Sequence, residues 1–252
     1  MEILLSRILK FMNGAIQYNY MYVLARFIVA HYLEMGDYTI ERMVEESGFS
    51  EAEILDFIGH FGFHNFEDFQ VRLQLDYDTR LSQISLRMLN VTPEEFMVHL
   101  KVSESKEEML DHVRDLCEMM FKARRIIIIG SAYPTAIAVD YQTDLITFGK
   151  EVITYHHFDT TFKFYEDDLV IVISATGRTL QYGDNLSALV AQGLCDSEIL
   201  LITQNRNLSK LHNICADEVI QVMGKYDGMM FNHQLMMIFD LFRIVYFKQY
   251  YQ

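Results

Sequence analysis

The sequence predicts an all-α N-terminal part followed by an α/β domain of three layers, built on a mainly parallel sheet. Two observations carry this prediction. Up to about residue 123, apolar residues recur at the spacing of amphipathic helices, as in Tyr22, Val23, Phe27, Ile28 and Tyr32. Beyond it, short β-branched runs alternate with helical segments, and the clearest runs are Ile126–Ile129, Val170–Ile173 and Ile199–Ile202. Such runs are typical of strands buried on both faces of a parallel sheet.

The composition is that of a folded protein. The 252 residues are 51% hydrophobic, which is enough to bury a core in one large or two small domains. No run of about 18 apolar residues occurs, so we expect no membrane span. The cysteines Cys117, Cys195 and Cys215 stand far apart and predict neither a disulfide nor a metal site. Because the first residues do not form a signal-peptide pattern, we expect a cytoplasmic protein.

The charge balance restricts the possible partners. Lys and Arg number 21 against 35 Asp and Glu, which gives a net charge of −14 at pH 7. The whole chain is therefore not attracted to DNA or to an anionic membrane surface. DNA binding would need a local group of basic residues.

The segment around residues 39–58 has the pattern helix, glycine turn, capped helix. Thr39 precedes the first predicted helix as its N-cap. Gly48 supplies the turn, because glycine adopts positive φ without steric cost. Ser50 caps the second helix, and Glu53 completes a capping box with it. This is the pattern of a helix-turn-helix.

A pair of connecting helices is predicted between the two parts. Thr92 and Pro93 form the N-cap and first position of one helix. Residues 105–121 form the next helix, with apolar side chains on one face. We therefore expect a helical domain at 1–85, connecting helices at 86–122 and the α/β domain at 123–252.

Two of the predicted strands end in turns rich in small and hydroxyl residues. The first runs into Gly130 and Ser131, and the second into Ser174-Ala175-Thr176-Gly177-Arg178-Thr179. Ligands of α/β sheets bind beyond the carboxyl ends of the strands. Hydroxyls and backbone amides there can surround a phosphate without a metal, and Arg178 can add a cation. The alternative interpretation is that these are ordinary turn and N-cap residues.

The second turn resembles the phosphosugar-binding loop of the SIS (sugar isomerase) domain, usually Ser-x-Ser-Gly-x-Thr, with Thr176 in place of the second serine. The resemblance extends over residues 106–252. It implies an α/β SIS domain that binds a phosphorylated sugar without cofactor or metal, through Gly130, Ser131, Ser174, Thr176, Gly177, Arg178 and Thr179. In the first turn, Tyr133 and Pro134 depart from the family pattern, and we expect them to narrow the pocket.

The helix-turn-helix segment resembles the DNA-binding head of the RpiR family of bacterial sugar-responsive regulators. It shares the turn spacing, the Ser50 cap, and Phe61-Gly62-Phe63 where the family has Leu-Gly-Phe. A head followed by an SIS domain is the order of that family. The resemblance implies a transcriptional regulator of sugar metabolism that forms a dimer or tetramer. The candidate DNA-contacting residues are Arg42, Ser50, Glu53 and Arg72.

The second helix of this head is acidic, which supports a different hypothesis. Glu53 and Asp56 stand where the family typically has Thr and Arg, and Glu51 adds a third carboxylate. Phosphates repel carboxylates at positions that face the DNA groove. The second hypothesis is therefore a phosphosugar-binding protein whose head has lost DNA binding and contacts protein partners or only dimerises.

A third hypothesis is an aldose–ketose phosphate isomerase. That chemistry needs a general base and a group that opens the sugar ring. The candidates are Glu218, His212, His233 and the adjacent His156 and His157, and none belongs to a recognised catalytic motif. We therefore expect a binding protein that is not an enzyme.

Overall fold

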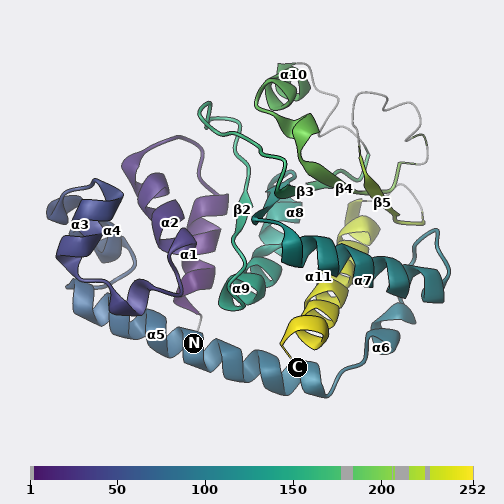
Figure 1. Ribbon diagram of the computed structural model, residues 1–252, viewed down its shortest axis with the longest axis horizontal. Helices are drawn as coiled ribbons and strands as arrows, with labels where there is room; N and C mark the ends of the chain where they lie inside the picture. The colour runs from purple at the N-terminus through teal and green to yellow at the C-terminus, as the bar shows by residue number, and fades with distance from the viewer. Residues whose placement is uncertain (1–2, 177–183, 206, 208–215, 225–227, 252) are drawn as a thin grey trace.

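The computed structural model describes residues 3–176, 184–205, 207, 216–224 and 228–251 (Figure 1). The first part holds the helices α1 (Leu4–Asn13), α2 (Tyr20–Ala30), α3 (Ile40–Ser47), α4 (Glu51–His60), α5 (Phe66–Leu89), α6 (Pro93–Met97) and α7 (Lys106–Lys122). In the second part the strands are β1 (Arg125–Ile129), β2 (Val152–Thr154), β3 (Asp168–Ile173), β4 (Glu198–Thr203) and β5 (Glu218–Gln221). Its helices are α8 (Ala132–Ile137), α9 (Val139–Thr147), α10 (Asp184–Ala191) and α11 (Gly228–Tyr250). Among these described helices, none is long and apolar enough to cross a membrane.

The strands form one parallel sheet in the order β2-β1-β3-β4-β5. The predicted parallel sheet is therefore confirmed. The chain leaves β1 towards one edge to form β2, and then crosses to the other side of β1 to form β3. The direction of winding thus reverses between β1 and β3, and such a switch point is where open α/β sheets bind ligands.

Both faces of the sheet are buried, as the isoleucine run of β1 predicts. Ile126 and Ile128 belong to the large core that includes residues of α7, α9 and α11. Ile127 points to the opposite face, into a smaller cluster with Phe162 of the β2–β3 connection and Leu189 of α10. Alternation of side chains along the strand explains why neighbouring isoleucines enter different clusters.

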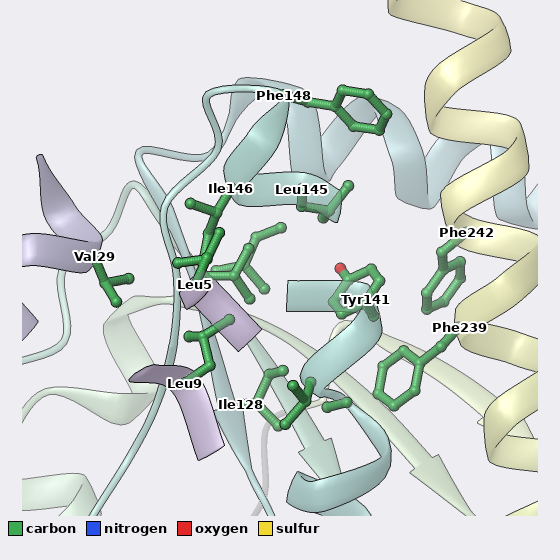
Figure 2. Close-up of a cluster of buried hydrophobic side chains, with 14 of the residues drawn as sticks. Leu5, Leu9, Val29, Ile128, Tyr141, Leu145, Ile146, Phe148, Phe239 and Phe242 are labelled. Carbon is green, nitrogen blue, oxygen red and sulfur yellow. The ribbon is translucent and has the colours of Figure 1, made fainter. Parts of the chain in front are cut away.

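The N-terminal helices pack into the same large core. Leu5 and Leu9 of α1 are fully buried and lie in one cluster with Ile128 of β1 and Tyr141 of α9 (Figure 2). Burying one such leucine stabilises a fold by about 1.5–3 kcal/mol. A polar contact also joins the two parts, because Ser6 Oγ lies 2.9 Å from Thr143 Oγ1. The domain bounds at 85 and 122 remain a prediction, and the buried cluster runs across both.

Capping explains where several helices begin. Ser50 and Glu53 form the predicted capping box at α4, and Thr92 begins α6 as predicted, with Glu95 as its capping-box partner. Ser105 and Glu108 form a further capping box at the start of α7. Each box satisfies backbone N–H groups that have no partner inside the helix.

Candidate functional site

The carboxyl ends of β1 and β3 bring the two predicted turns together. Ile129, the last residue of β1, pairs with Val172 of β3, so Gly130 follows at the level of Ile173. A Cβ atom on Gly130 would lie 3.5 Å from the Cβ atoms of both Ile173 and Pro134. The first turn therefore packs closely on the end of β3. Gly130 and Ser174 start connections on either side of the switch point.

The turn after β3 is held by the end of β4. The backbone N–H of Ser174, a buried residue, donates to the carbonyl of Ile202 at 3.0 Å and so extends the sheet by one position. The carbonyl of Ser174 accepts a hydrogen bond from Thr203 Oγ1 at 2.7 Å. Thr203 is itself fully buried. Its hydroxyl thus fixes the first peptide of the turn.

Two further bonds continue this bracing. The carbonyl of Ala175 accepts from the backbone N–H of Gln204 at 3.1 Å. The carbonyl of Thr176 accepts from Asn205 Nδ2, also at 3.1 Å. Three successive carbonyls of the turn therefore bind three successive residues, Thr203 at the end of β4 and the two that follow it. Gly177, Arg178 and Thr179, which the sequence places in the same site, lie outside the described residues.

The phosphosugar-loop motif did not identify the residues at the end of β4 that hold the turn. Thr203, Gln204 and Asn205 form a polar triplet directly after the buried run that ends at Ile202. That signal is visible in the sequence, since it repeats the arrangement seen after β3. Gln221 at the end of β5 joins the group, because its Nε2 donates to the carbonyl of Asn205 at 3.4 Å.

The first turn is more open than the second. Ser131 is exposed and precedes α8, and its carbonyl accepts from the backbone N–H of Thr135 at 3.1 Å and from Thr135 Oγ1 at 3.2 Å. Tyr133 is 65% exposed, and Pro134 packs against Gly130. The predicted narrowing of a pocket by Tyr133 and Pro134 is not tested by these contacts.

The catalytic candidates are not brought together. Glu218 begins the edge strand β5, where it pairs with Leu200 in the middle of β4, and its Oε2 lies 3.1 Å from His112 Nε2. His233 lies exposed on α11, and His212 is outside the described residues. His156 follows β2 and is buried between Tyr22 and Phe158, and this burial lowers its pKa to about 4. In the part of the chain that the structure describes, no group of three His, Cys, Asp or Glu side chains is arranged to hold a metal.

Helices α3 and α4 lie on either side of Gly48, at the positions that the sequence predicts. Gly48 ends α3 in the left-handed region, with φ of 73°, which only glycine adopts readily. The Ser50 N–H donates to Glu53 Oε2 at 2.9 Å, and Ser50 Oγ accepts from the Glu53 N–H at 3.4 Å. Hydrogen bonds from Ser50 lower the pKa of Glu53. Both side chains therefore serve the N-terminus of α4.

Acidic side chains hold both candidate phosphate-contacting arginines. Arg42 Nε donates to Glu46 at 2.7 Å, and its guanidinium lies 3.9 Å from the centre of the Tyr38 ring. Arg72 Nε donates to the buried Asp76 at 2.8 Å. Asp56 of α4 accepts a hydrogen bond from the Tyr20 hydroxyl at 2.5 Å.

Comparison with known proteins gives likenesses of fold only. No family model and no curated protein matches the sequence. Among solved structures, the Vibrio vulnificus NanR protein in complex with ManNAc-6P is 18% identical to this chain, with a TM-score of 0.43. The match covers 98% of this chain and 92% of the NanR chain. A hypothetical protein from Methanococcus jannaschii, whose inferred function is 3-hexulose-6-phosphate isomerase, is 21% identical with a TM-score of 0.45. The match covers 68% of this chain and 90% of the other.

A third structure is the C-terminal domain of glucosamine-fructose-6-phosphate aminotransferase from Francisella tularensis. It is 13% identical with a TM-score of 0.40, and the match covers 71% of this chain and 51% of the other. At TM-scores below 0.5 these likenesses carry no argument about function.

Proposed function

We propose that this protein binds a phosphorylated sugar at the carboxyl ends of β1 and β3, and that it acts as a sensor of that sugar. One observation carries the proposal. The carbonyls of Ser174, Ala175 and Thr176 are all bound to the end of β4. Carbonyl oxygens repel an anion, so the bracing keeps three of them turned towards the protein.

This arrangement suits a phosphate held without a metal. The hydroxyls of Ser174 and Thr176 stand at the switch point of the sheet, and Gly177, Arg178 and Thr179 continue the motif. Hydroxyls and amides are neutral donors that satisfy phosphate oxygens, and an arginine adds charge. The SIS-type loop sequence and its place in the sheet support the same function.

We also propose that the protein binds the phosphorylated sugar without converting it. Glu218, a general-base candidate, lies on the edge strand β5, two strands away from β3, and its carboxylate is beside His112. A general base must come within hydrogen-bond reach of the proton that it removes. An isomerase would therefore need another base at the carboxyl ends of the strands.

DNA binding through α3 and α4 is the second candidate function, and it would make the protein an RpiR-type, sugar-responsive regulator. The helix, glycine turn and capped helix support it. The ion pairs of Arg42 with Glu46 and of Arg72 with Asp76 favour a head that does not contact phosphates. We therefore place the sensor without DNA binding first.

Thermal unfolding with added ligands tests the proposed site. The probes are glucose 6-phosphate, fructose 6-phosphate, N-acetylmannosamine 6-phosphate and inorganic phosphate. A ligand at 100 times its Kd stabilises the folded state by about 2.7 kcal/mol. The double variant Ser174→Ala/Thr179→Ala should lose this stabilisation, and Ser103→Ala, at an exposed serine before α7, should keep it. Equal stabilisation of the double variant would place the site elsewhere.

Turnover is tested in the same samples. Proton NMR should show no interconversion of glucose 6-phosphate and fructose 6-phosphate over hours. If the wild-type protein converts the two sugars and Glu218→Gln abolishes the conversion, the protein is an isomerase and the sensor proposal is wrong.

A further inference from the structure

The long helix α5 has two apolar faces. One face is buried along the whole length of the helix, through Phe66, Phe69, Leu73, Ile84 and Met88. The other carries four large apolar residues that are exposed: Val71 (63%), Leu75 (57%), Leu86 (68%) and Leu89 (54%). Single exposed leucines are ordinary on protein surfaces.

The exposed residues form a single stripe. On a helix of 3.6 residues per turn, positions 71, 75, 78, 82, 86 and 89 follow one another at steps of three and four along one side. This outer stripe (Val71, Leu75, Asp78, Ser82, Leu86 and Leu89) lies on the side opposite to the buried residues. Figure 1 shows α5 along the lower edge of the molecule, with the rest of the protein above it.

The chemistry of the stripe excludes two kinds of partner. Its only charged residue is Asp78, and Glu67 and Asp68 lie exposed near its N-terminal end. An acidic face on a chain of net charge −14 is repelled by nucleic acid and by anionic lipid. An apolar stripe with a polar centre suits a protein helix of the same kind.

The stripe is complementary to itself when reversed. Its apolar pairs lie at the two ends, Val71 with Leu75 and Leu86 with Leu89, and Asp78 and Ser82 occupy the centre. In an antiparallel pair, Leu75 of one copy meets Leu86 of the other, and Asp78 meets Ser82. A carboxylate then faces a hydroxyl donor at the centre. Two-fold symmetry repeats each of these contacts.

A hollow beside the stripe fits this register. A cavity of about 130 Å³ is lined by Leu33 and by Leu73, Gln74 and Tyr77 of α5. It borders the stripe at Gln74, the position that Leu86 of a second copy would approach. Leu86 is the most exposed apolar residue of the helix. In packed helix pairs, a projecting side chain enters such a hole on the facing surface.

We propose that α5 pairs in antiparallel orientation with α5 of a second copy of this chain, through the outer stripe. The interface is isologous, and its axis passes near residue 80. The 24 residues of α5 give a contact of about 36 Å in length. This proposal does not depend on sugar binding or on DNA binding.

Sedimentation equilibrium of the full chain tests the pairing at concentrations from about 1 to 200 µM, where small interfaces associate. The wild-type protein should reach twice its monomer mass of 29.6 kDa. Leu75→Gln/Leu86→Gln should weaken association at least 10-fold, and Val98→Gln, at an exposed apolar residue after α6, should leave it unchanged. Circular dichroism confirms that the helices persist. A wild-type monomer throughout, or a double variant that dimerises normally, overturns the proposal.

Cysteine crosslinking tests the orientation in a Cys195→Ser/Cys215→Ser background. The variants Leu75→Cys and Leu86→Cys are oxidised alone and as a mixture. In the antiparallel pair, the two thiols introduced at position 75 are about 16 Å apart along the axis, too far for a disulfide. Only the mixture should therefore give a crosslinked dimer. Self-crosslinking of both single variants would show parallel pairing and overturn the proposal.

Discussion

Arg80 of α5 donates its Nε to Asp144 Oδ1 of α9 at a distance of 2.6 Å, and the carboxylate is fully buried. Arg243 of α11 approaches the same carboxylate from the other side, with its Nε 2.5 Å from Oδ2. One carboxylate thus joins three helices that lie far apart in the sequence. Two arginines balance its burial with charge-assisted hydrogen bonds.

Replacing Asp144 by Asn should destabilise the protein by about 3–5 kcal/mol, because the amide carries no charge and places an NH2 donor against one of the two largely buried arginines. Urea unfolding followed by circular dichroism measures the loss. The matched control is Asp111→Asn, which breaks the exposed pair of Arg114 with Asp111 at 2.7 Å. Exposed pairs contribute about 0–1 kcal/mol. Equal losses in the two variants would show that burial of Asp144 carries no special weight.

His156 should make stability depend on pH. Burial lowers its pKa from 6.5 to about 4, so between these values the unfolded state binds the proton and the folded state does not. Stability is therefore full above pH 6.5 and falls as the pH drops towards 4. The loss should amount to about 1–3 kcal/mol.

His156→Phe should remove this part of the pH dependence, since phenylalanine keeps the aromatic contacts with Tyr22 and Phe158. The measurement is the difference in unfolding free energy between pH 7 and pH 5, for wild type and variant. His233→Gln, at an exposed histidine of α11, is the control and should follow the wild type. If His156→Phe keeps the wild-type difference, another group causes the acid sensitivity.

The parts of the fold that sequence predicts are those set by local patterns. Ile126–Ile129 and Ile199–Ile202 read as buried strands because every position is apolar, and both lie within observed strands. Ser50 marks a helix start because its hydroxyl accepts from a nearby backbone N–H, and Thr92 marks another because Glu95 binds its backbone N–H. β5 is harder to recognise in the sequence, since it is only four residues long and is an edge strand that pairs with β4 alone.

The contacts between distant segments are not visible in such patterns. Thr203, at the end of β4, and Asn205, just after it, donate hydrogen bonds to carbonyls of the turn after β3. They reach this turn only because β4 lies next to β3 in the sheet, which the sequence does not reveal. Arg42 reads as a free cation in the sequence, and Glu46 reads as another surface charge. The structure pairs them across one helical turn. Their role towards DNA stays a prediction.

Ser50 should contribute to stability through its cap. Ser50→Ala removes the acceptor for the Glu53 N–H and should cost about 1 kcal/mol, and Ser50→Asp should restore most of it. Urea unfolding measures both variants. The control is Ser47→Ala at the end of α3, outside any N-cap. Full stability of Ser50→Ala would mean that α4 does not need this cap.

DNA binding should be absent or weak because the two candidate phosphate-contacting arginines are already paired with carboxylates. Fluorescence anisotropy against duplexes that tile the region upstream of the coding sequence, across a salt series, is the measurement. We expect no saturable binding, since Arg42 and Arg72 would have to leave Glu46 and Asp76 to reach a phosphate. A chain that contacts several phosphates shows a log–log salt slope of about −0.9 per phosphate. Saturable binding with such a slope, lost on Arg42→Ala, would establish the regulator and show that phosphate displaces Glu46 from Arg42.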